Sequence, residues 1–135
     1  MDGNEVRQIE LSLGFSLPEA YRSLLLNFPE QLTELYPADH AADERRLFNT
    51  AEPIISANTS VRAAGHRIDP DDPDSRWPDE YLIIGMDLGT NLYCLNRGQK
   101  RSRVYFWFHE DGQFESYAKN LAEFVQKLIR VYGQR

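Results

Sequence analysis

The chain contains Tyr81-Leu82-Ile83-Ile84-Gly85, then the reversal Asp87-Leu88-Gly89-Thr90, then Asn91-Leu92-Tyr93-Cys94-Leu95. Short apolar runs rich in β-branched and aromatic residues, bounded by turn residues, are typical of strands, so these two runs predict an antiparallel hairpin. Val104-Tyr105-Phe106-Trp107-Phe108 predicts a third strand. A turn at residues 110–113 follows, and residues 114–117 predict another extended segment. The centre of the chain therefore predicts a mostly antiparallel sheet with at least three strands.

Two helical patterns precede this region. The first has apolar residues at helical spacing and stops at Gly14, a residue suited to the left-handed conformation just past a helix end; the apolar residues are Val6, Ile9 and Leu13. The second opens with Ser16 and Glu19 at capping-box spacing and with Pro18 placed for the first helical turn, and Pro29 helps to end it. We therefore expect two N-terminal helices.

The pattern between these helices and the strands is weaker. Residues 30–46 are mixed in character and predict a loop with a helical turn. Residues 47–49 predict a short strand. Residues 52–61 predict a helix with Thr50 as its N-cap and Pro53 in its first turn.

The last helical pattern is the clearest. Apolar residues repeat at i, i+3, i+4 and i+7, and Asn120 and Glu123 are placed as N-cap and N3 partners; the apolar set is Leu121, Phe124, Val125, Leu128 and Tyr132. Helices first, strands next and a helix last describe an α+β fold rather than alternating βαβ units. We expect two N-terminal helices, a central mostly antiparallel β-sheet and a packed C-terminal helix, in a single domain over residues 1–135.

Composition restricts the function classes. The 135 residues are 41% hydrophobic, enough for one domain to bury a core and fold alone. The net charge of −6 opposes contact with a phosphate backbone, so no direct nucleic-acid partner is expected, whereas it would speed encounter with a basic protein. Cys94 is the single cysteine, no apolar stretch approaches membrane-spanning length, and the N-terminus lacks a signal-peptide pattern. We expect a cytoplasmic protein with no membrane contact.

Four segments then occur in a recognisable order. Residues 9–21, with Leu13-Gly14-Phe15-Ser16-Leu17-Pro18, join the first two expected helices, and Trp77-Pro78 precedes the hairpin; the next strand and the closing helix contribute residues 104–110 and 121–125. In this order the segments resemble the SUKH superfamily (Smi/Knr-like), from about residue 6 to the end of the chain. Many relatives carry an Asn/Gly-rich turn where this chain has Pro29-Glu30-Gln31, which leaves the path of the following loop open.

The resemblance implies a function as well as a fold. It implies an immunity protein that binds and neutralises a cognate bacterial toxin, possibly a nuclease, of a polymorphic or contact-dependent toxin system. It also implies that the protein is not an enzyme and uses no cofactor. Another branch of the superfamily regulates through protein contacts, so an intracellular regulatory or scaffold domain without a toxin partner is the alternative. The sequence leaves a monomer and a weak dimer open.

An acidic stretch is the predicted partner-binding surface. Residues 69–74 combine two prolines with four carboxylates, so they predict an exposed loop. Carboxylates beside a large aromatic fit interface anatomy if the toxin site is basic. A solvated loop without a partner is the simpler alternative. The residues assigned to the surface are Asp71, Asp72, Asp74, Trp77, Asp79 and Glu80.

Catalytic and metal sites have weaker support. A cysteine hydrolase would need Cys94, His109 and Asp87 to meet, but Cys94 lies inside an expected strand without a nucleophile turn, and the ring of His109 is expected to bond to backbone. The carboxylates between residues 69 and 79 lack the glycine and the distal glutamate of an EF-hand. The histidines have no zinc-ligand spacing; they are His40, His66 and His109. No metal site is expected.

Two further motifs are expected to be structural. The aromatics of residues 105–108, preceded by the basic run Lys100, Arg101 and Arg103, would stack on single-stranded nucleic acid only if they were exposed. Neighbouring strand residues point to opposite faces, so core packing is favoured. The glycines flank hairpins rather than opening a helix, so they predict turns rather than a phosphate loop; they are Gly85, Gly89 and Gly112.

Overall fold

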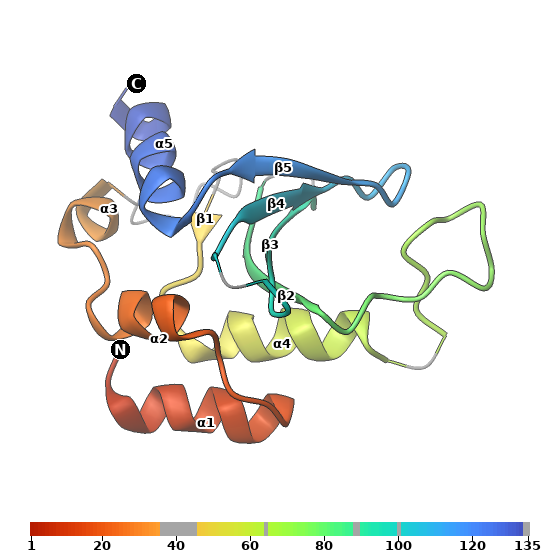
Figure 1. Ribbon diagram of the computed structural model, residues 1–135, viewed down its shortest axis with the longest axis horizontal. Helices are drawn as coiled ribbons and strands as arrows, with labels where there is room; N and C mark the ends of the chain where they lie inside the picture. Colours follow the sequence, from red (N-terminus) through yellow and green to blue (C-terminus); the bar gives the residue numbers. More distant parts are fainter. Residues whose placement is uncertain (36–45, 64, 88–89, 100, 134–135) are drawn as a thin grey trace.

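The computed structural model describes residues 1–35, 46–63, 65–87, 90–99 and 101–133, and these form an α+β fold (Figure 1). In chain order the elements are α1 (Gly3–Leu13), α2 (Glu19–Leu26), α3 (Glu30–Leu35), β1 (Arg46–Leu47), α4 (Ala51–Val61), β2 (Tyr81–Met86), β3 (Leu92–Asn96), β4 (Val104–Trp107), β5 (Phe114–Ala118) and α5 (Leu121–Gly133). The expected fold class is confirmed.

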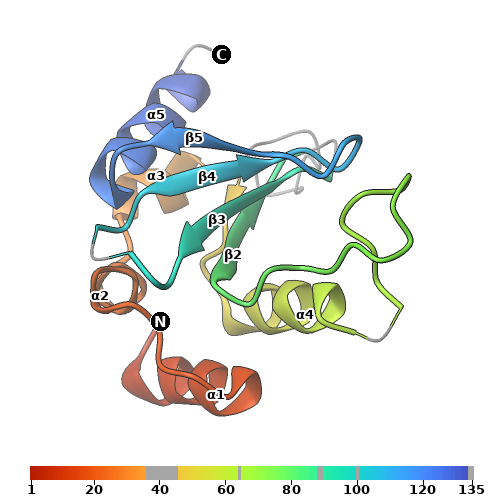
Figure 2. The ribbon, with the colours of Figure 1, turned by 45° about the vertical axis from the view of Figure 1, so that its right-hand side comes forward.

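The described strands form one sheet in the order β1-β2-β3-β4-β5, each antiparallel to its neighbour. Helix α4 lies between α1 and β2, and α5 packs against α3 and β5 (Figures 1 and 2). One short strand was expected at residues 47–49, whereas strand β1 covers Arg46–Leu47 and shares only Leu47 with that expectation. The expected hairpin, third strand and C-terminal helix are all present.

The two faces of the sheet bury different aromatic clusters. Tyr93 and Phe106 are paired across β3 and β4, and the Tyr93 ring lies 4.9 Å from the ring of Phe124 in α5. Trp107, the next residue in β4, points to the opposite face, where its ring lies 5.5 Å from that of Trp77. The fully buried Tyr93 and Phe124 show that α5 closes one side of the core.

The helix ends differ in part from the expectations. Gly14 ends α1 with a φ of 81°, as its position predicts. Helix α2 begins at Glu19 with Pro18 as its N-cap and no side-chain cap bond, so the expected capping box at Ser16 is wrong. Thr50 is the N-cap of α4, but its side chain makes no cap bond either. The helical turn expected within residues 30–46 is found at the start of that segment as the six-residue helix α3, and residues 36–45 of the expectation lie outside the described residues.

The N-cap of α5 forms with a shift of partner. The side chain of Asn120 accepts the Glu123 N–H at 2.8 Å, as expected for an N-cap. The Glu123 carboxylate accepts the N–H of Lys119, one residue before the position that a capping box uses. The hydrogen bond from Lys119 lowers the pKa of Glu123. Both backbone donors at this helix start are therefore satisfied.

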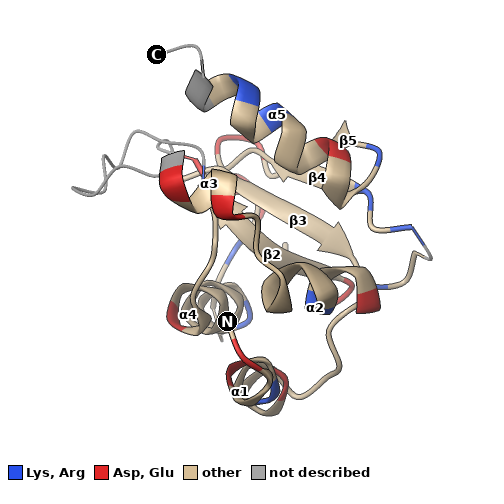
Figure 3. Ribbon diagram, turned by 90° about the vertical axis from the view of Figure 1, so that its left-hand side faces the viewer, with Lys and Arg blue, Asp and Glu red and all other residues tan. Residues whose placement is uncertain are grey.

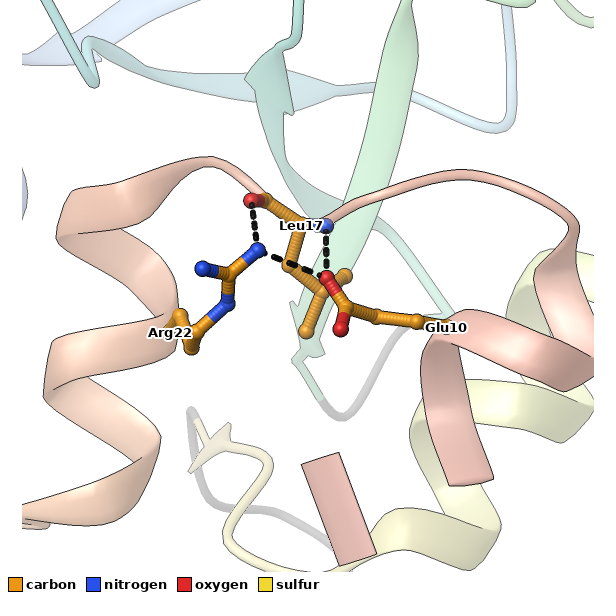
Figure 4. A network of polar contacts seen from close by, with 3 residues as sticks. All are labelled: Glu10, Leu17 and Arg22. Atoms are coloured by element: carbon orange, nitrogen blue, oxygen red, sulfur yellow. Dashed lines mark hydrogen bonds and ion pairs between the residues drawn. The ribbon is translucent and has the colours of Figure 1, made fainter. Parts of the chain in front are cut away.

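A carboxylate fixes the connection between α1 and α2 (Figure 4). One oxygen of Glu10 accepts the Leu17 N–H at 2.7 Å and the Arg22 guanidinium at 2.9 Å. The same guanidinium reaches the Leu17 carbonyl at 3.4 Å. The Leu17 N–H, and after it Arg22, hold the pKa of Glu10 below its usual range, although partial burial opposes them. Glu10 therefore links α1 to the α1–α2 connection and to α2.

The outer side of β2 is completed by a side chain. Strand β1 is only two residues long and pairs with Gly85 and Met86, where a Cβ on Gly85 would collide with the carbonyl of Arg46. Further back along β2, the fully buried amide of Asn58 donates to the Ile83 carbonyl at 2.9 Å and accepts the Ile83 N–H at 2.8 Å. Asn58 of α4 therefore takes the place of a further strand residue.

Candidate partner-binding surface

The acidic stretch predicted from the sequence is an exposed loop between α4 and β2. Its shape comes from two short turns, in which Asp69 accepts the Asp71 N–H and Asp72 accepts the Asp74 N–H, both at 2.9 Å. The Ser75 hydroxyl closes the loop by accepting the Asp69 N–H at 3.0 Å and donating to the Asp72 carbonyl at 2.7 Å. The exposed carboxylates of this loop are therefore held by ordered backbone.

The β4–β5 turn lies against the start of this loop, and this contact joins two acidic segments. A Cβ placed on Gly112 would lie 2.6 Å from the Ile68 carbonyl oxygen, and Gly112 has a φ of 71°. Glu110 and Asp111 in the turn are exposed. We call the combined set the acidic surface; it consists of Asp71, Asp72, Asp74, Glu110 and Asp111. The last two were missed from the sequence, because only the fold brings the turn to the loop.

Trp77 does not offer an exposed ring. It is 5% exposed, and its ring lies 5.5 Å from those of both Trp107 and Phe114. Its indole N–H donates to the Tyr81 carbonyl at 2.9 Å. The ring therefore packs in the core beside Trp107 and Phe114, and the assignment of Trp77 to a partner-binding surface stays a prediction. Trp77 ties the end of the acidic loop to the sheet.

Asp79 and Glu80 are exposed, but two arginines lie beside them. The Asp79 carbonyl accepts from Arg97 at 2.9 Å and from Arg62 at 3.3 Å, and the Glu80 carbonyl accepts the Arg97 N–H. The Arg97 guanidinium also lies 3.6 Å from the centre of the Phe15 ring. Both arginines therefore place positive charge beside the backbone of Asp79 and Glu80. The predicted site is therefore divided, and only its loop carboxylates belong to the acidic surface.

Positive charge gathers at the other end of β4. Arg101, Arg103 and Lys119 line one cleft between the β3–β4 connection and the start of α5. Figure 3 shows blue Lys and Arg segments on the connections that adjoin β4 and β5. Because β4 runs from this cleft toward the β4–β5 turn, the acidic surface and the basic cleft lie at opposite ends of the strand. The net charge is therefore unevenly distributed.

The residues considered for a hydrolase do not form a triad. The side-chain oxygen of Asn91 lies 2.7 Å from Nδ1 of His109, and Asn91 also donates its backbone N–H to Asp87 at 2.9 Å. The His109 ring thus contacts a side chain, and the expectation of a backbone partner is wrong. Cys94 is fully buried, and burial raises its pKa well above the usual thiol range. The thiol is therefore poorly suited to act as a nucleophile.

The aromatic residues 105–108 are at least half-buried, as the core-packing interpretation predicts. Trp107 is buried, and Tyr105, Phe106 and Phe108 are half-buried. Within the described ranges, no group of three His, Cys, Asp or Glu side chains could hold a metal ion. No described helix is long and apolar enough to cross a membrane. The predictions that concern His40, Gly89 and Lys100 lie outside the described residues.

Comparison with known proteins gives the family. The family model of the SMI1 / KNR4 family (SUKH-1) matches residues 2–127. No curated protein and no solved structure matches the chain. The matched range includes every described strand, the helices α1 to α4, the first half of α5, the acidic loop and the β4–β5 turn. The chain therefore belongs to the SMI1 / KNR4 family (SUKH-1).

Proposed function

We propose that this protein is a cytoplasmic immunity protein that binds and neutralises a cognate bacterial toxin domain, and that it acts by binding alone. The observation that carries the proposal is the family match over residues 2–127, because the family is compatible with an immunity role and its members generally bind proteins. The resemblance noted from the sequence points to toxins of polymorphic or contact-dependent systems, including nucleases.

The acidic surface supports this proposal through its charge and its order. Five exposed carboxylates stand on two segments that contact each other at Gly112. A toxin that binds nucleic acid needs a basic groove, and an anionic surface of an inhibitor can occupy such a groove. Because the loop is already held by Asp69, Asp72 and Ser75, little conformational freedom is lost on binding.

The mode of action follows from this arrangement. The carboxylates steer the toxin into contact at a rate that falls as salt rises, and the bound protein then covers the toxin's substrate groove. No covalent step is required. The buried Cys94 and the link from His109 to Asn91 support binding without catalysis.

The experiment is co-expression with the toxin domain encoded immediately upstream of this gene. Cells that produce the active toxin with the wild-type chain are expected to survive, and the two proteins are expected to co-purify. A toxin inactivated in its catalytic residues serves as the control for expression. If the active toxin kills cells despite soluble wild-type chain and the two proteins do not co-purify, the immunity proposal fails and a regulatory or scaffold role takes its place.

A further inference from the structure

Three adjoining hollows form one groove beside α2 and the start of α5. The first lies between the two helices and measures about 470 Å³, the second lies between the start of α2 and the β3–β4 connection and measures about 520 Å³, and the third is the basic cleft, of about 580 Å³. Ala20 lines all three, and Leu121 and Ala122 line the first and the third. We call this the α2–α5 groove. Both helices lie at the left-hand side of Figure 1, the side that Figure 3 turns toward the viewer.

The hollow between α2 and α5 is uncharged and partly apolar. None of the residues that line it is charged. Val125 is buried, and Leu24 and Ile129 are half-buried. Helix α5 packs mainly against α3 and β5, so its face toward α2 stays accessible. An apolar floor with a polar rim suits one apolar side chain of a partner. Each helix lines the hollow with positions i, i+3, i+4 and i+7, which are Ala20, Ser23, Leu24 and Asn27 in α2 and Ala122, Val125, Gln126 and Ile129 in α5.

The basic cleft gives the other end of the groove the opposite of the chain's net charge. Arg101, Arg103 and Lys119 line it together with the start of α5, whose helix dipole adds partial positive charge. Arg103 donates to the Ser116 hydroxyl at 2.8 Å, and no described carboxylate forms an ion pair with any of the three cations. In a chain with a net charge of −6, this end of the groove therefore favours an anionic occupant.

These two ends together select the occupant. A nucleic acid needs cations along its whole path, whereas the hollow between the helices is uncharged and Glu19 lines the middle hollow. A second copy of this chain offers an acidic loop, but the apolar residues beside that loop are packed in its own core; they are Ile68 and Trp77. A segment of another protein that carries both carboxylates and an apolar side chain fits both ends.

We propose that the α2–α5 groove is a second docking site, which binds an acidic segment of a protein partner. The apolar side chain of the segment enters the hollow between Leu24 and Val125, and its carboxylates meet Arg101, Arg103 and Lys119. The site lies at the opposite end of β4 from the acidic surface, so its occupation leaves the acidic surface free. This inference goes beyond the proposed function and requires no toxin.

A peptide titration followed by ¹⁵N NMR at low salt tests the inference. The probe is a synthetic peptide with a central leucine between two pairs of glutamates, capped at both ends. The backbone N–H signals of Ala20 and Ala122 are expected to shift, while that of Gly112, beside the acidic surface, stays in place. Peptides with a central alanine, or with lysines in place of the glutamates, are expected to bind roughly tenfold more weakly or worse.

Matched variants locate the site. Arg101→Glu reverses a charge in the basic cleft and Ser23→Phe places a ring in the hollow between the helices, and each is expected to weaken the leucine peptide roughly tenfold. Arg7→Glu and Ser12→Phe make the same changes on α1, at exposed residues that line none of the three hollows, and are expected to leave binding unchanged. All four substitutions are at exposed positions, and circular dichroism checks that each variant is folded.

Three results would overturn the inference. Equal binding by the groove variants and their α1 controls would place the peptide elsewhere. Equal binding of the leucine and alanine peptides would mean that only charge is recognised. Tighter binding of a single-stranded oligothymidylate with the same number of negative charges would make the groove a phosphate-binding site and not a protein-docking site.

Discussion

Replacing Asn58 by leucine is the sharpest test of how α4 and the sheet are joined. The side chain is fully buried and satisfies both backbone groups of Ile83, at 2.8 and 2.9 Å, and it also accepts from Arg62 at 3.1 Å. Leucine has a similar shape but leaves the Ile83 N–H and carbonyl buried without partners. Each such group costs about 1–3 kcal/mol, so the variant should lose roughly 2–6 kcal/mol. A domain of this size has only about 5–15 kcal/mol of stability in total.

The assay is urea unfolding at neutral pH, followed by the fluorescence of the two tryptophans. Thr59→Leu is the matched control, because Thr59 is the next residue of α4 and is exposed. Its free energy of unfolding should lie within about 0.5 kcal/mol of the wild type. If Asn58→Leu loses less than about 1 kcal/mol with an unchanged urea slope, the amide does not replace a strand residue at β2 in the way described.

Four further results are expected. Lysine at all three loop positions Asp71, Asp72 and Asp74 should slow association with the toxin roughly tenfold at low salt and flatten the salt dependence of the rate. Stopped-flow mixing measures this rate, and an unchanged rate would remove the acidic surface from the interface. Gly112→Ala should lower the free energy of unfolding by about 1–3 kcal/mol, because the alanine would combine a positive φ with a clash at Ile68. The variant should also speed hydrogen exchange in the acidic loop, and protection equal to that of the wild type would contradict the contact between the turn and the loop. Glu10→Gln should cost about 0.5–1 kcal/mol at neutral pH. Because the pKa of Glu10 is lowered in the folded state, the stability difference between wild type and variant is present above the usual carboxyl pKa and should vanish as pH falls through the lowered value. A stability difference that persists in acid unfolding curves would argue against the Leu17 contact. Cys94→Ser should destabilise by about 1–3 kcal/mol yet preserve toxin binding, and the native thiol should resist iodoacetamide; rapid labelling of the folded protein would contradict its burial.

Local spacing was enough to predict much of the fold. The strands of the hairpin, the end of α1 at Gly14 and the Asn120 cap of α5 depend on residues within a few positions of one another. The exposed loop at residues 69–74 follows from its prolines and carboxylates. Each of these features could be predicted because the chain determines it locally.

Features that depend on distant segments could not be predicted in the same way. Trp77 stands among charged residues in the sequence, but its neighbours in space are the rings of Trp107 and Phe114. Gly112 predicted only a turn, and its approach to Ile68 is visible only in the fold. Asn58 looks like an ordinary helix residue, yet it completes the hydrogen bonding of β2.

The proposed function depends on direct inhibition, so the measurement that tests it most directly is a titration of purified toxin domain with the purified wild-type chain, following the toxin's own catalytic activity. The account predicts that activity falls to zero at one chain per toxin, that the complex migrates as one species, and that the apparent affinity weakens as salt rises. Full toxin activity in the presence of excess folded chain would contradict the account.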